Sequence, residues 1–261
     1  MPGHVEERIE VNGCDISVMR GGAGPTVLYL HGASGRGGWL PFMDKLAARY
    51  EVIAPEHPGF GTSDDPAWFD TMQDLAYFYL EFLRTQGLQD VHLVGLSLGG
   101  WLAAEIAVRN TSRLKTLTLV DAAGIHVAGV PQIDTFMMSG EDRIRAFFFD
   151  KQKAEAMVAR LFTPETERIA IKNSVATAKL SWQPRGHNPH LHKWLHLIDV
   201  PTLLLWGEND VLLPPAYAYA FQELIPGAKV TVFPECGHLP TVEKADDFVA
   251  ALAAHFERSG S

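Results

Sequence analysis

Cysteine is scarce in this chain of 261 residues, which contains only Cys14 and Cys236. Two cysteines so far apart in the sequence exclude a disulfide-rich scaffold and a four-cysteine zinc site. We expect both to be buried, reduced thiols, which is typical of a cytoplasmic protein.

Basic residues are also outnumbered. Lys and Arg total 22 against 31 Asp and Glu, so the net charge at pH 7 is -9. Such a charge repels phosphate backbones and no basic run offsets it, so nucleic acid is not an expected partner. Hydrophobic residues make up 47% of the chain and charged residues 20%. This composition excludes intrinsic disorder and predicts a sizeable core.

Long apolar runs are missing as well. No run approaches the ~20 residues that span a bilayer, so no membrane partner is expected. The first residues, MPGHVEERIEVNG, lack a basic region followed by an apolar one, so they do not resemble a signal peptide. We therefore expect a soluble, cytoplasmic protein.

Short apolar runs, by contrast, recur along the chain. An initial β-hairpin is predicted, because alternating segments flank Asn12-Gly13, a strong two-residue turn signal. Six further runs are wholly apolar or nearly so, as strands buried on both faces should be. They are Thr26–Leu30, Val52–Ala54, Val91–Val94, Leu117–Val120, Thr202–Trp206 and Val230–Phe233.

Helical stretches separate most of these strands. Strand–helix alternation predicts an α/β fold with a mostly parallel sheet and helices on both faces, which binds ligands beyond the carboxyl ends of the strands. The predicted helices are Trp39–Arg49, Thr71–Thr85, Leu98–Arg109, Pro215–Leu224 and Lys244–Arg258.

One region breaks the alternation. Residues 124–197 contain helical stretches at Glu141–Phe149, Lys151–Leu161 and Pro164–Leu180, and no convincing strand. A helical insertion between two strands is best interpreted as a lid over the active face. We therefore predict a core of residues 1–123 and 198–261 with a helical cap subdomain at 124–197.

The most specific motif is Gly95-Leu96-Ser97-Leu98-Gly99-Gly100, which follows an apolar strand and begins a helix. That context is typical of a nucleophile elbow, a tight turn that exposes a serine hydroxyl above the sheet. Side chains at the two flanking glycines would collide with neighbouring backbone. Ser97 is therefore the candidate nucleophile.

A serine hydroxyl needs a base, and that base needs a carboxylate. His238 lies in a loop between the last strand and the last helix, which places it near Ser97. His31 also ends a strand but precedes the serine, against the order Ser, acid, His of this motif. Asp210, just after a strand, is the preferred acid; Asp121 and Glu208 are the alternatives.

Acyl chemistry also needs hydrogen-bond donors for the oxyanion. We assign these to the backbone N–H groups of Leu98 and Ala33, with Ser34 as the alternative to Ala33. His31 is interpreted as a structural loop residue. Substrate contacts are expected from Ser34, Trp182, Val211 and Leu239.

No cofactor is expected. The glycines at 21–24 lack the strand–GxGxxG–helix context of a dinucleotide site. A metal is not expected either, because no carboxylate or thiol completes a ligand set in the histidine cluster. That cluster consists of His187, His190, His192 and His196.

These motifs together resemble the α/β-hydrolase superfamily. The matching segments are LYLHGASG, VIAPEHPGFGTSD, VHLVGLSLGGWLA, PTLLLWGENDVLLPP and ECGHLPTVEKADDFVAAL. The resemblance implies the α/β-hydrolase fold, with Ser97 as nucleophile, Asp210 as acid, His238 as base, and Ala33 and Leu98 in the oxyanion hole. Residues 124–197 would correspond to the variable cap of the family.

Differences from individual branches of the superfamily narrow the range of activities to be expected. Epoxide hydrolases and haloalkane dehalogenases carry Asp at the elbow, and cofactor-free haloperoxidases often carry Trp where this chain has Ala33. Hydrolases that cleave carbon–carbon bonds in ring-fission products commonly have Asn where this chain has Leu96, and a cap Arg for which Arg185 is the candidate.

The leading hypothesis is therefore a serine hydrolase that cleaves an ester, thioester or lactone of a small to medium apolar substrate. Carbon–carbon bond hydrolysis of a diketone-like substrate is the second hypothesis. A ligand receptor on the same fold is the third, and the intact set of Ser, Asp and His argues against it.

Overall fold

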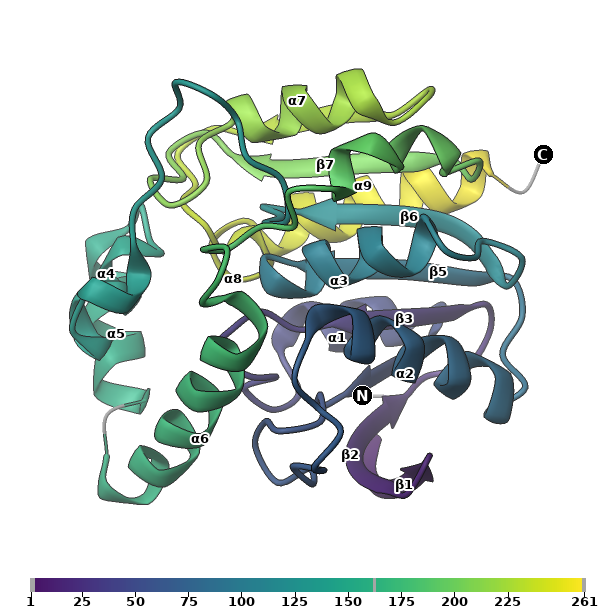
Figure 1. The fold of residues 1–261 in the computed structure, drawn as a ribbon, viewed down its shortest axis with the longest axis horizontal. Coiled ribbons are helices and arrows are strands. Elements are labelled where there is room, and N and C mark those ends of the chain that lie inside the picture. The colour runs from purple at the N-terminus through teal and green to yellow at the C-terminus, as the bar shows by residue number, and fades with distance from the viewer. Residues whose placement is uncertain (1–2, 162, 260–261) are drawn as a thin grey trace.

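The computed structural model describes residues 3–161 and 163–259. Their strands form an eight-stranded sheet in the order β1-β2-β4-β3-β5-β6-β7-β8 (Figure 1). The strands are β1 (His4–Val11), β2 (Cys14–Gly21), β3 (Thr26–Leu30), β4 (Glu51–Pro55), β5 (Val91–Leu96), β6 (Leu114–Val120), β7 (Thr202–Gly207) and β8 (Lys229–Phe233). The six apolar runs identified in the sequence lie within β3 to β8, so the predicted α/β sheet is confirmed.

The predicted hairpin joins β1 to β2. Asn12 and Gly13 both have positive φ, 52° and 70°, as a two-residue hairpin turn requires. Val11 pairs with Cys14 across this turn. The strand β2 is antiparallel to β1 and to β4, and the remaining neighbours pair in parallel. The carboxyl ends of β3 to β8 therefore meet at one edge of the sheet.

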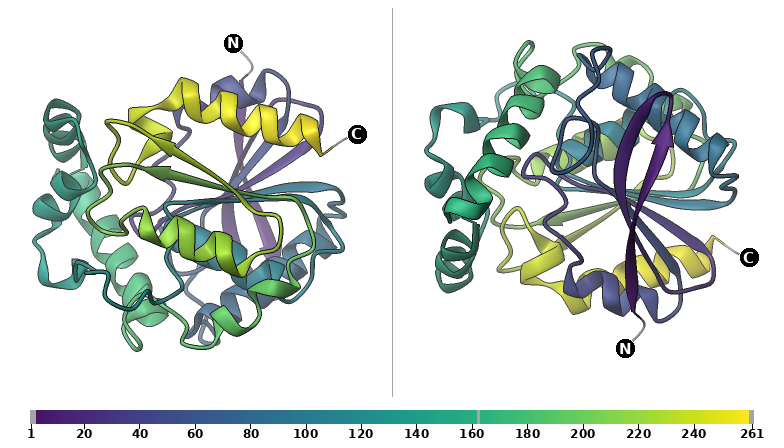
Figure 2. Two further views of the ribbon diagram at one scale, coloured as in Figure 1. Left: turned by 90° about the horizontal axis from the view of Figure 1, so that it is seen from above. Right: turned by 90° about the horizontal axis from the view of Figure 1, so that it is seen from below.

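Helices cover both faces of the sheet (Figure 2). The two hydrophobic clusters show which side each packs on: α1 and α9 share one cluster with Leu203 and Leu205 of β7. The other cluster joins α2, α3 and α7 to Leu204 and Trp206. Each buried leucine of this kind contributes about 1.5–3 kcal/mol relative to an exposed one. The helices of the core are α1 (Pro41–Ala47), α2 (Met72–Thr85), α3 (Leu98–Ala107), α7 (Ala216–Leu224), α8 (Pro240–Glu243) and α9 (Ala245–Arg258).

A helical segment separates β6 from β7. Its elements are η1 (Thr135–Met137), α4 (Gly140–Ala146), α5 (Lys151–Leu161), α6 (Pro164–Ser181), η2 (Leu191–Lys193) and η3 (Leu195–Leu197). The helices α4, α5 and α6 lie beyond the carboxyl ends of the central strands (Figure 1). The described residues of 124–197, called the inserted segment below, form no strand, although an isolated bridge joins Gly124 and His187.

None of the helices within the described ranges is both long and apolar enough to cross a membrane.

Candidate active site

Ser97 stands in the sharp turn between β5 and α3. Its φ of 55° and ψ of -113° are strained for a side chain with a Cβ, a feature that is common at functional sites. A Cβ on Gly95 would lie 2.1 Å from the carbonyl oxygen of Gly99. A Cβ on Gly99 would lie 2.2 Å from the carbonyl oxygen of Leu30. The turn therefore accepts only glycine at both positions, as the motif predicts.

The structure brings His238 and Asp210 to this serine. Nε2 of His238 lies 2.9 Å from Oγ of Ser97, and Nδ1 of the same ring lies 2.7 Å from Oδ2 of Asp210. The side chains of His238 and Asp210 are buried. Oδ1 of Asp210 accepts hydrogen bonds from the backbone N–H groups of Leu212 and Leu213, which fix its orientation. The three residues predicted to act together thus form a continuous chain of hydrogen bonds.

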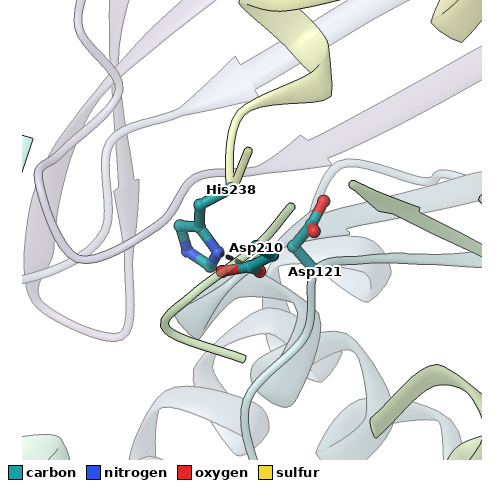
Figure 3. A group of neighbouring side chains, drawn as sticks. All are labelled: Asp121, Asp210 and His238. Atoms are coloured by element: carbon teal, nitrogen blue, oxygen red, sulfur yellow. Dashed lines mark hydrogen bonds and ion pairs between the residues drawn. The ribbon is translucent and has the colours of Figure 1, made fainter. Parts of the chain in front are cut away.

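Asp121, the alternative acid, lies at the end of β6 beside this chain. In Figure 3 the Asp210 carboxylate lies between the His238 ring and Asp121. Oδ1 of Asp121 accepts the N–H of Gly207 at 2.9 Å, whereas its buried Oδ2 has no hydrogen-bond partner in the described structure. Complete burial and the nearby charge of Asp210 raise the pKa of Asp121 well above its ordinary value. The raised pKa favours the neutral form of Asp121, and the partner of His238 is Asp210.

Asp121, Asp210 and His238 also form a possible metal-ligand group. One ligand atom from each residue lies within 4.8 Å of the other two. Among the described residues, these three are the ones that could together hold a metal ion. A cation would require Asp121 to lose its proton and His238 to give up its contact with Asp210. The residues therefore fit a histidine–carboxylate pair beside a buried second carboxyl group better than a metal site. His187, His190, His192 and His196 form no such group among the described residues.

The loop after β3 carries the predicted oxyanion donors. Ala33 follows Gly32, whose carbonyl oxygen accepts the N–H of Gly35 in a tight turn. Leu98 is the first residue of α3, so its N–H has no acceptor within the helix. Both residues line a cavity that contains Ser97 and His238.

His31 fixes the loop after β3 through two hydrogen bonds of its ring. Its Nε2 accepts the backbone N–H of His57 at 3.0 Å, so its Nδ1 carries the proton and donates it to the carbonyl oxygen of Gly32. Burial lowers the pKa of His31 to about 3, and the ring stays neutral. These contacts agree with the structural role expected for His31.

The inserted segment makes hydrogen bonds to the loop after β3 and to His238. Oγ1 of Thr177 donates to the carbonyl oxygen of Ala33, and Nδ2 of Asn173 donates to that of Ser34. The carbonyl oxygen of Phe147 accepts the backbone N–H of His238 at 2.8 Å. Sequence reasoning missed these three residues. The spacing of Asn173 and Thr177, two polar residues on one face of a predicted helix, was the available signal.

Glu243 is a further residue that the sequence did not reveal. Its buried carboxylate accepts the N–H groups of Gly237, Phe149 and Asp150. One carboxylate thus joins the loop of His238 to the inserted segment. A Cβ on Gly237 would lie 2.5 Å from the carbonyl oxygen of Phe147, which explains the glycine before His238.

Two cavities flank Ser97. The first, of about 90 Å³, is lined by Trp101, Phe136 and Leu213 and is called the Trp101 cavity. The second, of about 110 Å³, is lined by Leu40, Phe147 and Val242 and is called the Leu40 cavity. Both also include Ala33, Ser97 and His238. A substrate cleaved by Ser97 therefore has space for a group on each side of the scissile bond.

The expected substrate contacts divide into two pairs. Ser34 and Leu239 line the Leu40 cavity. Trp182 and Val211 lie outside the described walls of both cavities and are 54% and 49% exposed. Trp182 instead packs against Arg185, whose guanidinium lies 4.0 Å from the centre of the Trp182 ring. The apolar surface of Trp182 therefore forms part of the outer surface of the inserted segment.

Comparison with known proteins agrees with this geometry. Residues 27–252 match the alpha/beta hydrolase family, and the chain belongs to that family. It is 30% identical to the dihydrolipoyllysine-residue acetyltransferase component of the acetoin cleaving system of Cupriavidus necator, over 94% of this chain and 67% of that protein.

Two further relatives are hydrolases. The chain is 28% identical to 2-hydroxy-6-oxo-6-(2'-aminophenyl)hexa-2,4-dienoic acid hydrolase of Metapseudomonas resinovorans, over 98% of this chain and 92% of that protein. It is 29% identical to Lipase 1 of Psychrobacter immobilis, over 86% of this chain and 74% of that protein. The chain is therefore an enzyme of the serine hydrolase type.

Proposed function

We propose that this enzyme hydrolyses a carboxylic ester, thioester or lactone through an acyl-enzyme on Ser97. The observation that supports this most strongly is the chain of hydrogen bonds from Ser97 through His238 to Asp210, with lengths of 2.9 and 2.7 Å. In this role Ser97 is the nucleophile, His238 the general base and Asp210 the acid that orients and stabilises the imidazolium.

The reaction follows from the positions of these atoms. Nε2 of His238 takes the proton of Ser97 as Oγ attacks the carbonyl carbon, and the oxyanion forms opposite the N–H groups of Ala33 and Leu98. His238 then protonates the departing alcohol or thiol. Water enters, His238 removes its proton, and the resulting hydroxide releases the acid from Ser97.

The inserted segment would act as the cap of this site, over a core of residues 1–123 and 198–261. Hydrogen bonds from Asn173 and Thr177 to the oxyanion loop support this role, because they connect α6 to the catalytic residues directly. The partner is a small molecule with apolar groups, since apolar side chains dominate the walls of the Leu40 cavity. Both cysteines are buried and unpaired, which supports a cytoplasmic location.

Hydrolysis of a carbon–carbon bond is the second candidate, favoured by the similarity to the dienoic acid hydrolase. Two features of this chain make it the weaker one. Leu96 precedes the nucleophile, and it offers no polar group to the substrate. Arg185 lines the Trp101 cavity, but its guanidinium pairs with Asp134 at 3.2 Å and packs on Phe136 and Trp182.

A substrate panel separates the candidates. The panel combines p-nitrophenyl esters of graded chain length, lactones and ring-fission diketones. Ester or lactone turnover at least tenfold above diketone turnover is the expected result. The opposite ranking would establish carbon–carbon bond hydrolysis, and binding without turnover would indicate a receptor.

A further inference from the structure

A third cavity lies between the inserted segment and the core. It measures about 400 Å³ and has walls from α4, α5 and α6 on one side and from residues 33–38 and 56–62 on the other. We call it the Arg160 cleft. It adjoins the Leu40 cavity, and the two have six wall residues in common: Ala33, Ser34, Gly37, Ile144, Arg160 and Leu161. A substrate bound at Ser97 can therefore extend into it.

Arg143, in one wall of the Arg160 cleft, has no partner among the described residues. The guanidinium of Arg143 makes no hydrogen bond or ion pair with any residue that the structure describes. Its neighbour on α4, Arg145, takes the nearby acids instead and pairs with Glu141 at 3.0 Å and with Glu155 at 2.8 Å. Burial alone lowers the pKa of Arg143, as expected for a desolvated cation with no counter-charge.

Arg160 brings a second positive charge to the same cleft. Its contact in the described structure is Sδ of Met157 at 3.4 Å, a weak acceptor without charge. The acid on the opposite wall, Glu56, lies 3.8 Å from the guanidinium of Arg36, which also pairs with Glu6 at 2.8 Å, and Glu56 makes no ion pair with Arg143 or Arg160 in the described structure. The cleft therefore contains two cations that no described carboxylate neutralises.

We propose that Arg143 and Arg160 bind an anionic group, a carboxylate or a phosphate, at the end of the substrate remote from the scissile bond. Guanidinium groups bind both anions through paired N–H donors. An anion would also offset the cost of keeping Arg143 desolvated and unpaired. This inference rests on the proposed function and specifies its substrate class as an ester whose chain ends in an anion.

The test compares charged and neutral esters of equal length. The probes are the mono-p-nitrophenyl esters of adipic, pimelic and suberic acid, each matched by its ω-methyl ester, and the p-nitrophenyl ester of 6-phosphonohexanoic acid. At the best chain length we expect kcat/KM for a charged ester to exceed that of its neutral match about ten- to a hundredfold. The ranking of carboxylate against phosphonate identifies the preferred anion.

Three variants assign the effect to residues. Arg143→Gln and Arg160→Gln should each reduce the preference for the charged ester at least fivefold, chiefly through KM. Arg145→Gln is the matched control, because it removes the same charge from the same helix but should keep the preference. Neutral-ester turnover should stay within about twofold in Arg145→Gln, and circular dichroism reports correct folding in all three. If Arg143→Gln fails that check, Arg160→Gln, which alters an exposed side chain, carries the test.

Two results would overturn the inference while the proposed function stands. One is equal or better turnover of the neutral ester at every chain length in the unaltered enzyme. The other is a preference for the charged ester that survives in Arg143→Gln and Arg160→Gln or disappears equally in Arg145→Gln. Absence of turnover for neutral and charged esters alike would instead contradict the proposed function itself.

Discussion

Replacement of Asp210 by asparagine tests the assignment of the acid most directly. Oδ1 of Asp210 accepts the N–H groups of Leu212 and Leu213 at 2.9 and 3.1 Å, while Oδ2 faces Nδ1 of His238 at 2.7 Å. Asparagine must keep its carbonyl oxygen at the Oδ1 position, because both N–H groups need an acceptor. Its NH₂ group then points at His238.

A donor at that position reverses the tautomer of the histidine. Nδ1 becomes the acceptor, and the ring proton moves to Nε2, which faces Oγ of Ser97 and can no longer take its proton. The equivalent substitution in a serine protease lowers kcat about 10⁴-fold. We expect a loss of the same order here, which corresponds to ~5.4 kcal/mol at 1.36 kcal/mol per tenfold change.

The assay is kcat for a p-nitrophenyl ester, with circular dichroism to verify the fold. Asp121→Asn is the matched control. Since the raised pKa of Asp121 favours its neutral form, asparagine can keep the acceptor for Gly207 and replace a neutral carboxyl by a neutral amide. We expect less than about a tenfold loss in this control. A 10⁴-fold loss in Asp121→Asn with a small one in Asp210→Asn would refute the reasoning and move the acid to the end of β6.

Four further predictions follow from the same geometry. A fluorophosphonate should add covalently to Ser97, and intact-mass analysis should find no adduct in Ser97→Ala; an adduct that persists there would exclude Ser97 as nucleophile. The ratio kcat/KM should rise from acidic to neutral pH, because the base must be neutral, and EDTA should have no effect; activity lost in EDTA and restored by zinc would indicate a metal site. Thr177→Val should lower kcat about three- to tenfold at unchanged KM, because it frees the carbonyl oxygen of Ala33 from its hydrogen bond; equal kinetics would show that α6 does not position the loop. Burial lowers the pKa of His31 to about 3, so the unfolded chain binds a proton at His31 more tightly than the folded chain does, and the free energy of unfolding falls as the pH drops from about 6.5 toward 3. In His31→Gln, urea unfolding should show a decrease in this free energy between pH 8 and 5 that is about 2 kcal/mol smaller than in the unaltered enzyme. An equal decrease in both would contradict the neutral, buried state of His31.

Much of the core could be predicted from local patterns. Apolar runs of three to five residues marked the positions of β3 to β8 in the sequence. The expectation of burial on both faces was wrong for β8, which is half exposed because it lies at the edge of the sheet. The motif around Ser97 was equally informative, because the close approach of Gly95 and Gly99 to backbone atoms is a property of the turn itself. Both features depend on residues that are close together in the chain, so they can be recognised from the sequence.

The choice between Asp210 and Asp121 depended on more. Both follow strands, and because β6 and β7 are neighbours, both carboxyl groups arrive at the same edge of the sheet. The order Ser, acid, His favoured Asp210, but it gave no account of what Asp121 does beside it. Only the folded chain shows that His238 contacts Asp210, and that burial next to this charge raises the pKa of Asp121.

The sequence by itself determined the fold class and predicted the nucleophile and the residues able to serve it, since these follow from short-range periodicity and turn chemistry. Tertiary structure alone decided the walls of the site. It excluded Trp182 and Val211 from them, tied Asn173 to Ser34 across 139 residues and left Arg143 without a counter-charge among the described side chains. The physical reason is that periodicity reports which face of a helix is buried, whereas the partner of that face is set by the packing of the inserted segment against the core.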